Sequence, residues 1–151
     1  MELYSFKENE LLTGISILAV LRHAKQLDLA KCMLIEPLLS YSQVLNALKR
    51  ANSSIKSIED LILKQNIPFT NFNNRFKDKF LLSMNSILLF EKLRLITISE
   101  NNIYFCAYDF NFLDPSLGEA AANRIAASGK LAEILTKGDA SDLYLSLRVH
   151  I

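Results

Sequence analysis

Apolar residues recur at helical spacing along most of the chain, and they differ in how much of each helix they cover. From Glu8 to about Gln26, apolar side chains occupy nearly every face, which predicts a helix surrounded by other helices. The apolar stretch 29–39 contains Pro37, which lacks an amide hydrogen and disfavours helical geometry at the residue before it. We therefore expect a short helix that ends near Pro37. Residues 41–50 predict another short amphipathic helix.

The clearest helix start lies in the middle of the chain. Ser57 and Asp60 have the spacing of a capping signature, in which a hydroxyl and a carboxylate bind free amides of the first turn. A helix of about nine residues should start there and end before Pro68. A long helix should follow over residues 71–92, with one face that we expect to lie in the core. That face carries Phe72, Phe76, Phe80, Met84, Ile87 and Leu88.

Two short runs after this helix have the composition of strands. Residues 93–99 and 103–107 are rich in β-branched and aromatic side chains, and they flank the turn sequence Glu100-Asn-Asn102. Helix, helix and hairpin follow one another in the order of a winged helix. The predicted fold class is therefore mainly α: a winged helix, meaning a helix-turn-helix plus a β-hairpin wing, with additional N- and C-terminal helices.

The last part of the chain is expected to be helical again. Asp114 can cap a helix whose first residue is Pro115, and this helix should reach about Lys137 and end at Gly138. A stripe of small residues along it would allow a neighbouring helix to approach closely. A final short helix should follow Asp139.

Composition agrees with a mainly helical protein. Leu and Ile supply 41 residues whereas Gly, Pro and Trp together supply 7, which excludes disordered, collagen-like and turn-rich all-β chains. A length of 151 residues suffices to bury one core. The expected single domain, 1–151, comprises N-terminal apolar helices (8–40), the winged-helix segment (41–108) and C-terminal helices (114–151).

Cysteine spacing and the length of the apolar runs bear on the compartment. Cys32 and Cys106 have apolar neighbours and no metal-ligand spacing, so we expect two reduced core thiols, with a disulfide as the alternative. The first ten residues carry three acids and lack the basic region of a signal peptide. The uncharged run Leu11–Leu21 is too short to span a membrane. We expect a cytoplasmic protein with no membrane partner.

The near-neutral total charge hides an uneven distribution. Residues 46–95 carry nine basic and four acidic residues, whereas the whole chain has a net charge of +1. Such a basic segment is what a helix-turn-helix needs to neutralise DNA phosphates, and the alternative is a solvated helix face. The candidate contacts to DNA or to a partner are Lys49, Arg50, Lys56, Lys64, Arg75, Lys77, Lys79 and Arg94.

No residue pattern in the sequence indicates catalysis. His23 and His150 have no Cys, Asp or Glu at ligand or triad spacing, and no phosphate-binding loop occurs. Asp109 and Asp114 are better explained as a loop residue and a helix cap than as an acid/base or metal pair. We therefore predict a protein that is not an enzyme, with no catalytic residue, no metal and no cofactor.

Several short motifs occur in an order that is similar to a known family. They are Ile35-Glu-Pro-Leu38, Phe72-Asn-Asn-Arg75-Phe76, Asn85-Ser-Ile-Leu-Leu-Phe90 before the hairpin, and Asp142-Leu-Tyr-Leu-Ser-Leu-Arg-Val149. In this order the chain resembles the middle component of bacterial three-component ABC systems. These are small winged-helix proteins encoded between an SMC-like ABC ATPase and a third, effector-bearing component. The resemblance implies an adaptor that joins the ATPase to its partner on double-stranded DNA, in systems of antiphage defence or genetic conflict.

The sequence is also similar to the kleisin-interacting winged-helix subunits of bacterial condensin-type complexes, which pair with themselves and so imply a possible homodimer. An autonomous winged-helix DNA-binding transcriptional regulator is the alternative function. Arg75, near the start of the long helix, is a candidate for pairing with a carboxylate or phosphate. Arg124 is expected to bury its stem against a neighbouring helix and to pair inside the protein.

Overall fold

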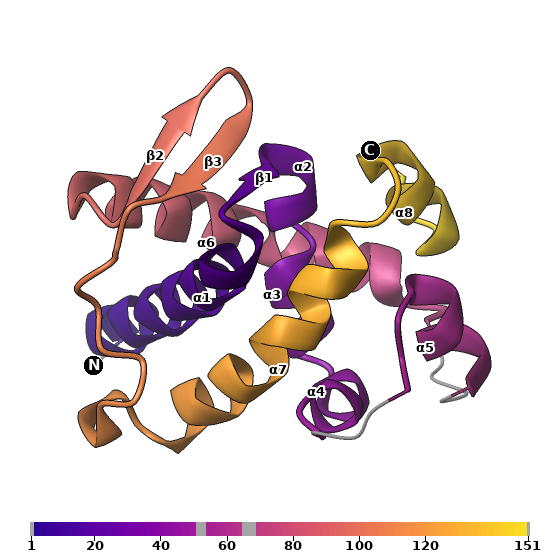
Figure 1. The fold of residues 1–151 in the computed structure, drawn as a ribbon, viewed down its shortest axis with the longest axis horizontal. Helices are drawn as coiled ribbons and strands as arrows, with labels where there is room; N and C mark the ends of the chain where they lie inside the picture. The colour runs from indigo at the N-terminus through magenta and orange to yellow at the C-terminus, as the bar shows by residue number, and fades with distance from the viewer. Residues whose placement is uncertain (1, 51–53, 65–68, 151) are drawn as a thin grey trace.

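The computed structural model describes residues 2–50, 54–64 and 69–150, with side chains from Asn9 onward (Figure 1). It shows a mainly helical protein with a small antiparallel sheet, which confirms the mainly helical class. Within these residues, no helix has the length and apolar character needed to cross a bilayer. The elements are α1 (Glu2–Ala24), β1 (Gln26–Asp28), α2 (Leu29–Cys32), α3 (Ile35–Leu39), α4 (Ser42–Leu48), α5 (Ile58–Lys64), α6 (Phe72–Lys92), β2 (Ile96–Ser99), β3 (Asn102–Phe105), the 3-10 helix η1 (Pro115–Leu117), α7 (Glu119–Leu135) and α8 (Ala140–Ser146).

Helix α1 runs through the middle of the molecule and packs on both α6 and α7 (Figure 1). Its apolar residues face several neighbours, and Leu18 and Leu21 are fully buried. The prediction of a helix surrounded by other helices is therefore confirmed. Gly14 lets α6 come close to α1, because a Cβ at this position would overlap the ring of Phe90.

The predicted hairpin is confirmed, and a further strand joins it. β2 and β3 pair antiparallel around a tight turn, in which Glu100 and Asn101 have φ values of 50° and 66°. Two successive residues with positive φ form the type I′ turn that matches the twist of a hairpin. β1 pairs with the other edge of β3, so the strand order in the described part of the chain is β1-β3-β2. The sequence pattern does not predict β1, because its 3 residues are too few to show alternation.

Two helix boundaries differ from the prediction. Pro37 is the third residue of α3, and the helix continues beyond it. Proline fits there because the amides of a first helical turn have no acceptor within the helix. In the C-terminal part, Asp114 caps η1 through the amide of Ser116, and Gly118 ends it with a φ of 94°. The single helix predicted for this region is therefore interrupted, and α7 starts after Gly118.

The capping signature before α5 forms with one change. Ser57 Oγ accepts a hydrogen bond from the amide of Asp60 at 3.1 Å, as predicted. The Asp60 carboxylate accepts from the amide of Lys56 at 2.9 Å, one residue further back than in the standard box. This hydrogen bond, helped by the nearby charge of Lys64, holds the pKa of Asp60 below its usual range. The predicted end of the helix before Pro68 lies outside the described residues.

Both cysteines are free thiols, as predicted, but they differ in burial. Cys32 is buried, whereas Cys106 is exposed, so the prediction of a core thiol at position 106 is wrong. Side chains alternate in the extended chain that follows β3, and Phe105 and Ala107 take the inward positions on either side of Cys106.

The predicted core face of the long helix is only partly buried. Phe72 and Phe76 lie in the core, as expected. Phe80 and Leu88 are exposed, so their assignment to the core is wrong. Apolar side chains cover a wider arc of α6 than its contacts with α1 and α3 use.

A buried ion pair joins α1, α3 and α7. Glu36 on α3 is 2% exposed, and its Oε1 accepts hydrogen bonds from Arg124 on α7 and, at 2.6 Å, from Thr13 Oγ1 on α1. Arg124 Nη1 also donates to Ser16 Oγ on α1 at 3.3 Å. The prediction that Arg124 pairs inside the protein is confirmed, and its partner is an acid 88 residues away in sequence.

Removing one member of this pair should destabilise the protein far more than removing both. Arg124→Met leaves the Glu36 carboxylate buried without a counter-charge, so the free energy of unfolding should fall by about 3–5 kcal/mol. The double variant Glu36→Leu, Arg124→Met should recover most of this loss. As a control, Lys130→Met removes a partly exposed pair on α7 and should cost less than about 1 kcal/mol. Urea denaturation followed by circular dichroism measures all three, and an Arg124→Met variant as stable as the control would contradict the assignment.

Candidate functional site

The outer side of α6 exposes large apolar side chains. Phe80, Leu81 and Leu88 are 44%, 67% and 46% exposed. The half-buried Met84 lies on the same side at helical spacing. The other side of the helix packs on α1 and α3. We call these four residues the α6 apolar face.

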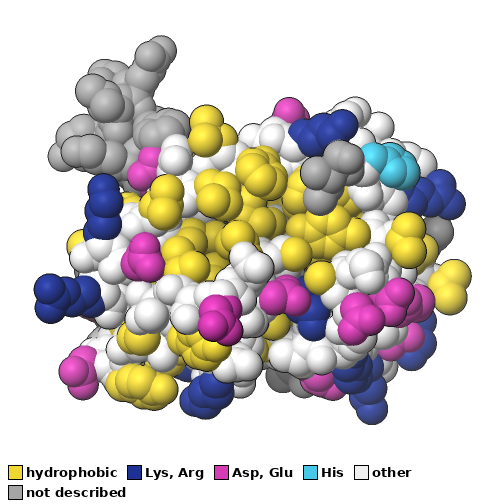
Figure 2. Space-filling view, turned by 90° about the horizontal axis from the view of Figure 1, so that it is seen from above, with side chains coloured by type: hydrophobic (Ala, Val, Ile, Leu, Met, Phe, Trp, Pro, Cys, Tyr) yellow, Lys and Arg dark blue, Asp and Glu magenta, His cyan; other side chains and the backbone are white. Residues whose placement is uncertain are grey.

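One face of the molecule is apolar over much of its middle. Figure 2 looks down on the top of Figure 1, where the β2–β3 hairpin and α8 lie, and shows hydrophobic side chains gathered there. Charged side chains border them, with several acidic ones close to the apolar area and others toward the edge of the view. Contiguous exposed apolar areas with a polar border are typical of sites that contact another protein.

A groove lies at the C-terminal end of α6. Its volume is about 680 Å³, and α1, the end of α6 and the segment from η1 into α7 line it. Leu11 of α1 and Leu93 after α6 are large exposed apolar side chains in its lining, and Phe110 and Leu117 line it as well. We call it the α1–α6 groove. An apolar side chain of a partner would lose water-exposed surface on entering it.

The sequence pattern predicts neither feature, although it contains a signal. Phe80 and Leu88 fit one helical stripe with residues that do lie in the core, so helical spacing predicts that they are buried. Leu81 lies outside that stripe and widens the apolar arc of the helix. When the apolar arc of a helix is wider than the area that its neighbours in the fold cover, the remaining apolar side chains are available to contact a partner.

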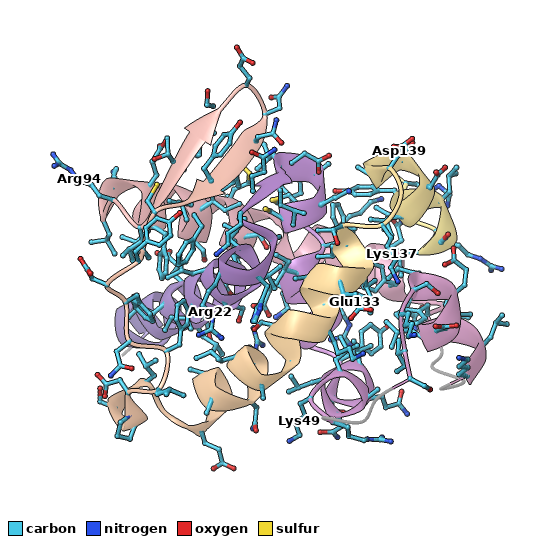
Figure 3. The ribbon with its side chains drawn as sticks, viewed as in Figure 1. Arg22, Lys49, Arg94, Glu133, Lys137 and Asp139 are labelled. Carbon is cyan, nitrogen blue, oxygen red and sulfur yellow. The ribbon has the colours of Figure 1, made fainter. Side chains whose placement is uncertain are left out.

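The basic candidates from the sequence do not gather in one patch. Figure 3 shows Lys49 and Arg94 near well-separated edges of the molecule, the first after α4 and the second before β2. Lys49 Nζ donates to Asn123 at 3.4 Å, and Arg50 Nε donates to the carbonyl of Asn46 at 3.2 Å. The two ends of the predicted basic segment therefore lie in different surroundings.

The remaining lysine candidates lie around α5 and along α6. Lys56 is exposed, and Lys64 pairs with the capping carboxylate of Asp60 at 3.7 Å. Lys77 is exposed and Lys79 is half-buried, both in the N-terminal half of α6. Lys77 lies one helical turn from Leu81, so this charge borders the α6 apolar face.

Arg75 is turned toward the protein. Its guanidinium carbon lies 3.9 Å from the centre of the Tyr41 ring, and Nη1 donates to the carbonyl and the hydroxyl of Ser40 at 3.5 and 3.4 Å. Its Nε is buried and has no hydrogen-bond partner among the described atoms. This side chain therefore fastens α6 to the link between α3 and α4. The sequence contained no signal that Tyr41 would receive it.

Two titratable groups, the half-buried Tyr144 and the buried Cys32, serve packing. Among these residues, no group of three His, Cys, Asp or Glu side chains lies close enough to hold a metal ion. Burial raises the pKa of the Tyr144 hydroxyl to about 12, and this hydroxyl donates to the carbonyl of Ala30 at 2.6 Å. Burial also raises the pKa of the Cys32 thiol. Tyr144 thus ties α8 to α2.

Comparison with known proteins adds no assignment to these surfaces. No protein-family model matches the chain, and neither a curated protein nor a solved structure matches it. Function is therefore inferred from the exposed surfaces and from the resemblance carried by the sequence motifs.

Replacing Arg75 should lower stability, whereas replacing Lys77 should not. Arg75→Gln removes the cation from the face of Tyr41, and the free energy of unfolding should fall by about 1 kcal/mol. Lys77→Gln removes an exposed charge from the same helix and should change it by less than about 0.5 kcal/mol. Urea denaturation of both variants measures the difference. Equal stability would mean that the Arg75 guanidinium is free for a partner, which contradicts the packing role.

Proposed function

We propose that this protein is a non-enzymatic winged-helix adaptor that joins an SMC-like ABC ATPase to an effector-bearing third component. The observation that carries the proposal is the α6 apolar face. Large apolar side chains such as Leu81 cost free energy when they face water, so a helix that exposes several of them is suited to burial against another protein. The identity of the partners rests on the resemblance to the middle components of three-component ABC systems.

The arrangement of the elements supports the winged-helix part of this proposal. Strand β1 follows helix α1, and the long helix α6 directly precedes the β2–β3 hairpin. β3 pairs with both other strands, so the hairpin and β1 form one sheet in the described chain. In the proposed fold, α6 takes the place of the recognition helix, which reads the major groove in DNA-binding members.

The chemistry of α6 favours a protein partner over direct reading of bases. Recognition helices present Arg, Lys, Asn or Gln to base edges. The outer side of α6 instead presents Phe80, Leu81 and Leu88, while Arg75 is held inside by Tyr41. The exposed Lys77 is suited to an added phosphate contact, so double-stranded DNA is proposed as a secondary partner.

The alternative, an autonomous transcriptional regulator, makes a different prediction about DNA. It requires submicromolar binding to a defined duplex, with an affinity that falls steeply as the salt concentration rises. An adaptor requires a stable protein complex and only weak duplex binding on its own. Mobility-shift titrations of the isolated chain at two salt concentrations separate the two functions.

Co-purification tests the adaptor directly. The tagged chain is co-expressed with the coiled-coil ATPase and the third component encoded beside it. The wild type should recover at least one of them. The double variant Leu81→Glu, Leu88→Glu should lose that partner, because burying a carboxylate at an apolar interface costs several kcal/mol.

The control is Leu63→Glu, which introduces the same charge at a leucine on α5 that is 78% exposed. This variant should recover the partner as the wild type does. Failure of the wild type to recover either component would overturn the proposal. Equal loss in the control and in the α6 variant would overturn the assignment of the α6 apolar face.

A further inference from the structure

A hollow of about 350 Å³ lies at the C-terminal end of α1, and Phe110 lines both this hollow and the α1–α6 groove. It is formed between that helix end and the chain that leaves β3. Two basic residues and several aromatic ones line it. They are Arg22, Lys25, Phe105, Tyr108, Phe110 and Phe112.

The two basic side chains line this hollow without being neutralised by an ion pair. Arg22, near the end of α1 (Figure 3), lies over the ring of Phe112 with its guanidinium carbon 4.3 Å from the ring centre. The carbonyl of Lys25 accepts a hydrogen bond from the amide of Phe105 at 2.9 Å, which anchors its backbone. Within the described part of the chain, neither side chain forms an ion pair with a carboxylate.

The charges of Arg22 and Lys25 act on the neighbouring imidazole of His23. Burial lowers the pKa of His23, and the charges of Arg22 and Lys25 lower it further. The charges of these two residues therefore act on the same end of α1.

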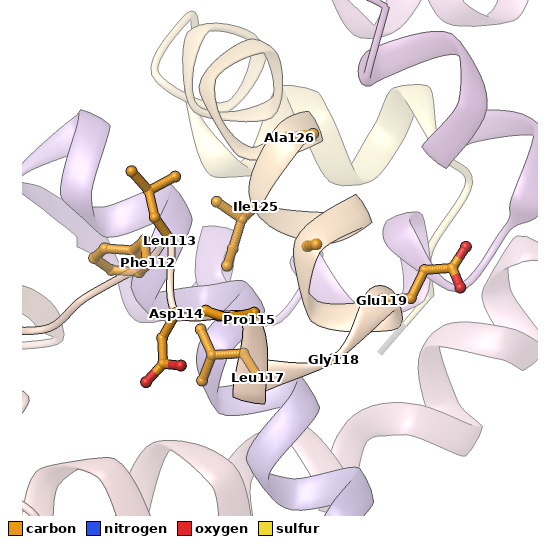
Figure 4. Close-up of a pocket in the computed structure, with 10 residues that line it drawn as sticks. Phe112, Leu113, Asp114, Pro115, Leu117, Gly118, Glu119, Ile125 and Ala126 are labelled. Atoms are coloured by element: carbon orange, nitrogen blue, oxygen red, sulfur yellow. The ribbon is translucent and has the colours of Figure 1, made fainter.

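A second hollow continues from the first. Its volume is about 420 Å³, and it lies between the segment around η1 and α7 (Figure 4). Phe112 and Leu113 line both hollows, so the two adjoin. The far part is mostly apolar, with Leu117 and Ile125 in its lining, and Asp114 and Glu119 are its charged residues.

We propose that these adjoining hollows bind an extended acidic peptide segment of another protein. A carboxylate of the peptide pairs with Arg22 and Lys25, and a neighbouring bulky apolar side chain enters the hollow beside Leu117 and Ile125. The planar guanidinium of Arg22, already oriented by Phe112, suits bidentate binding of a carboxylate.

The rest of the lining distinguishes a peptide from other anions. The two hollows join a part with two basic residues to a part lined mainly by apolar residues, whereas a nucleotide phosphate chain would meet no basic residue in the second part. Asp114 and Glu119 at the far part repel a polyanion such as a DNA backbone. A peptide with an acidic side chain next to an apolar one can contact the basic residues of the first hollow and the apolar residues of the second. This site is separate from the α6 apolar face, so the inference holds or fails independently of the proposed ATPase partner.

Selection from a random phage-displayed peptide library on the immobilised full chain tests the ligand class. The enriched peptides should carry Asp or Glu next to Leu, Ile or Phe. Enrichment of peptides without acidic residues, or no enrichment over a blank surface, would overturn the proposal.

Charge reversal then locates the site. The most enriched peptide, labelled with fluorescein, is titrated with each variant by fluorescence anisotropy. Lys25→Glu should weaken binding by at least about tenfold, because a like charge at a desolvated contact costs more than about 1.4 kcal/mol. Arg22→Gln should weaken it as well. Lys92→Glu, a matched reversal at an exposed lysine on α6 that lines neither hollow, should leave the affinity within about twofold of the wild type.

Two further measurements keep the result interpretable. Thermal unfolding should give Lys25→Glu the same midpoint as the wild type, because the Lys25 side chain is exposed. Unlabelled duplex DNA of about twenty base pairs should fail to displace the peptide. Displacement by DNA, or equal loss of binding in Lys25→Glu and Lys92→Glu, would overturn the site.

Discussion

The ion pair between Glu36 and Arg124 is the constraint on which the mutual packing of α1, α3 and α7 depends. A carboxylate that is 2% exposed requires a counter-charge and hydrogen-bond donors, and α7 and α1 supply them through Arg124 and Thr13. Apolar contacts alone would tolerate small sliding of α7 along α1, because burial has no direction. The pair fixes one arrangement. It thereby also fixes the walls that α7 contributes to the α1–α6 groove and to the hollow beside Ile125.

Around this fixed centre, the chain has more apolar surface than its own core uses. α1 lies among the other helices and, from Ile15 to Leu21, buries its apolar residues, whereas α6 buries one side and exposes the other. The basic residues are divided in the same way. Arg75 and Arg124 serve packing, and Lys77 and Lys25 remain exposed. The exposed apolar and basic side chains, not a cluster of titratable groups, are therefore the features with which this protein can recognise partners.

Features set by neighbouring residues could be predicted from the sequence, and those set by distant residues could not. The cap at Ser57, the turn at Glu100 and Asn101 and the span of α6 follow from short-range chemistry. The partner of Arg124, the Tyr41 ring under Arg75 and the pairing of β1 with β3 join segments far apart in the chain. The burial of Phe80 was mispredicted for the same reason, because helical spacing defines a side but not what covers it. For the candidate site, the sequence shows which residues are apolar or basic, but not which of them lie together on the surface.

The central claim is that a partner covers the α6 apolar face, and thiol labelling measures this most directly. Leu81→Cys is introduced together with Cys106→Ser, since Cys106 is exposed, while Cys32 is buried and its raised thiol pKa keeps it unreactive. The rate of maleimide labelling is compared for the isolated chain and for its complex with the proposed ATPase and third component. The account predicts rapid labelling of the isolated chain and severalfold slower labelling in the complex. A complex that forms while the introduced thiol on α6 reacts at an unchanged rate would contradict it.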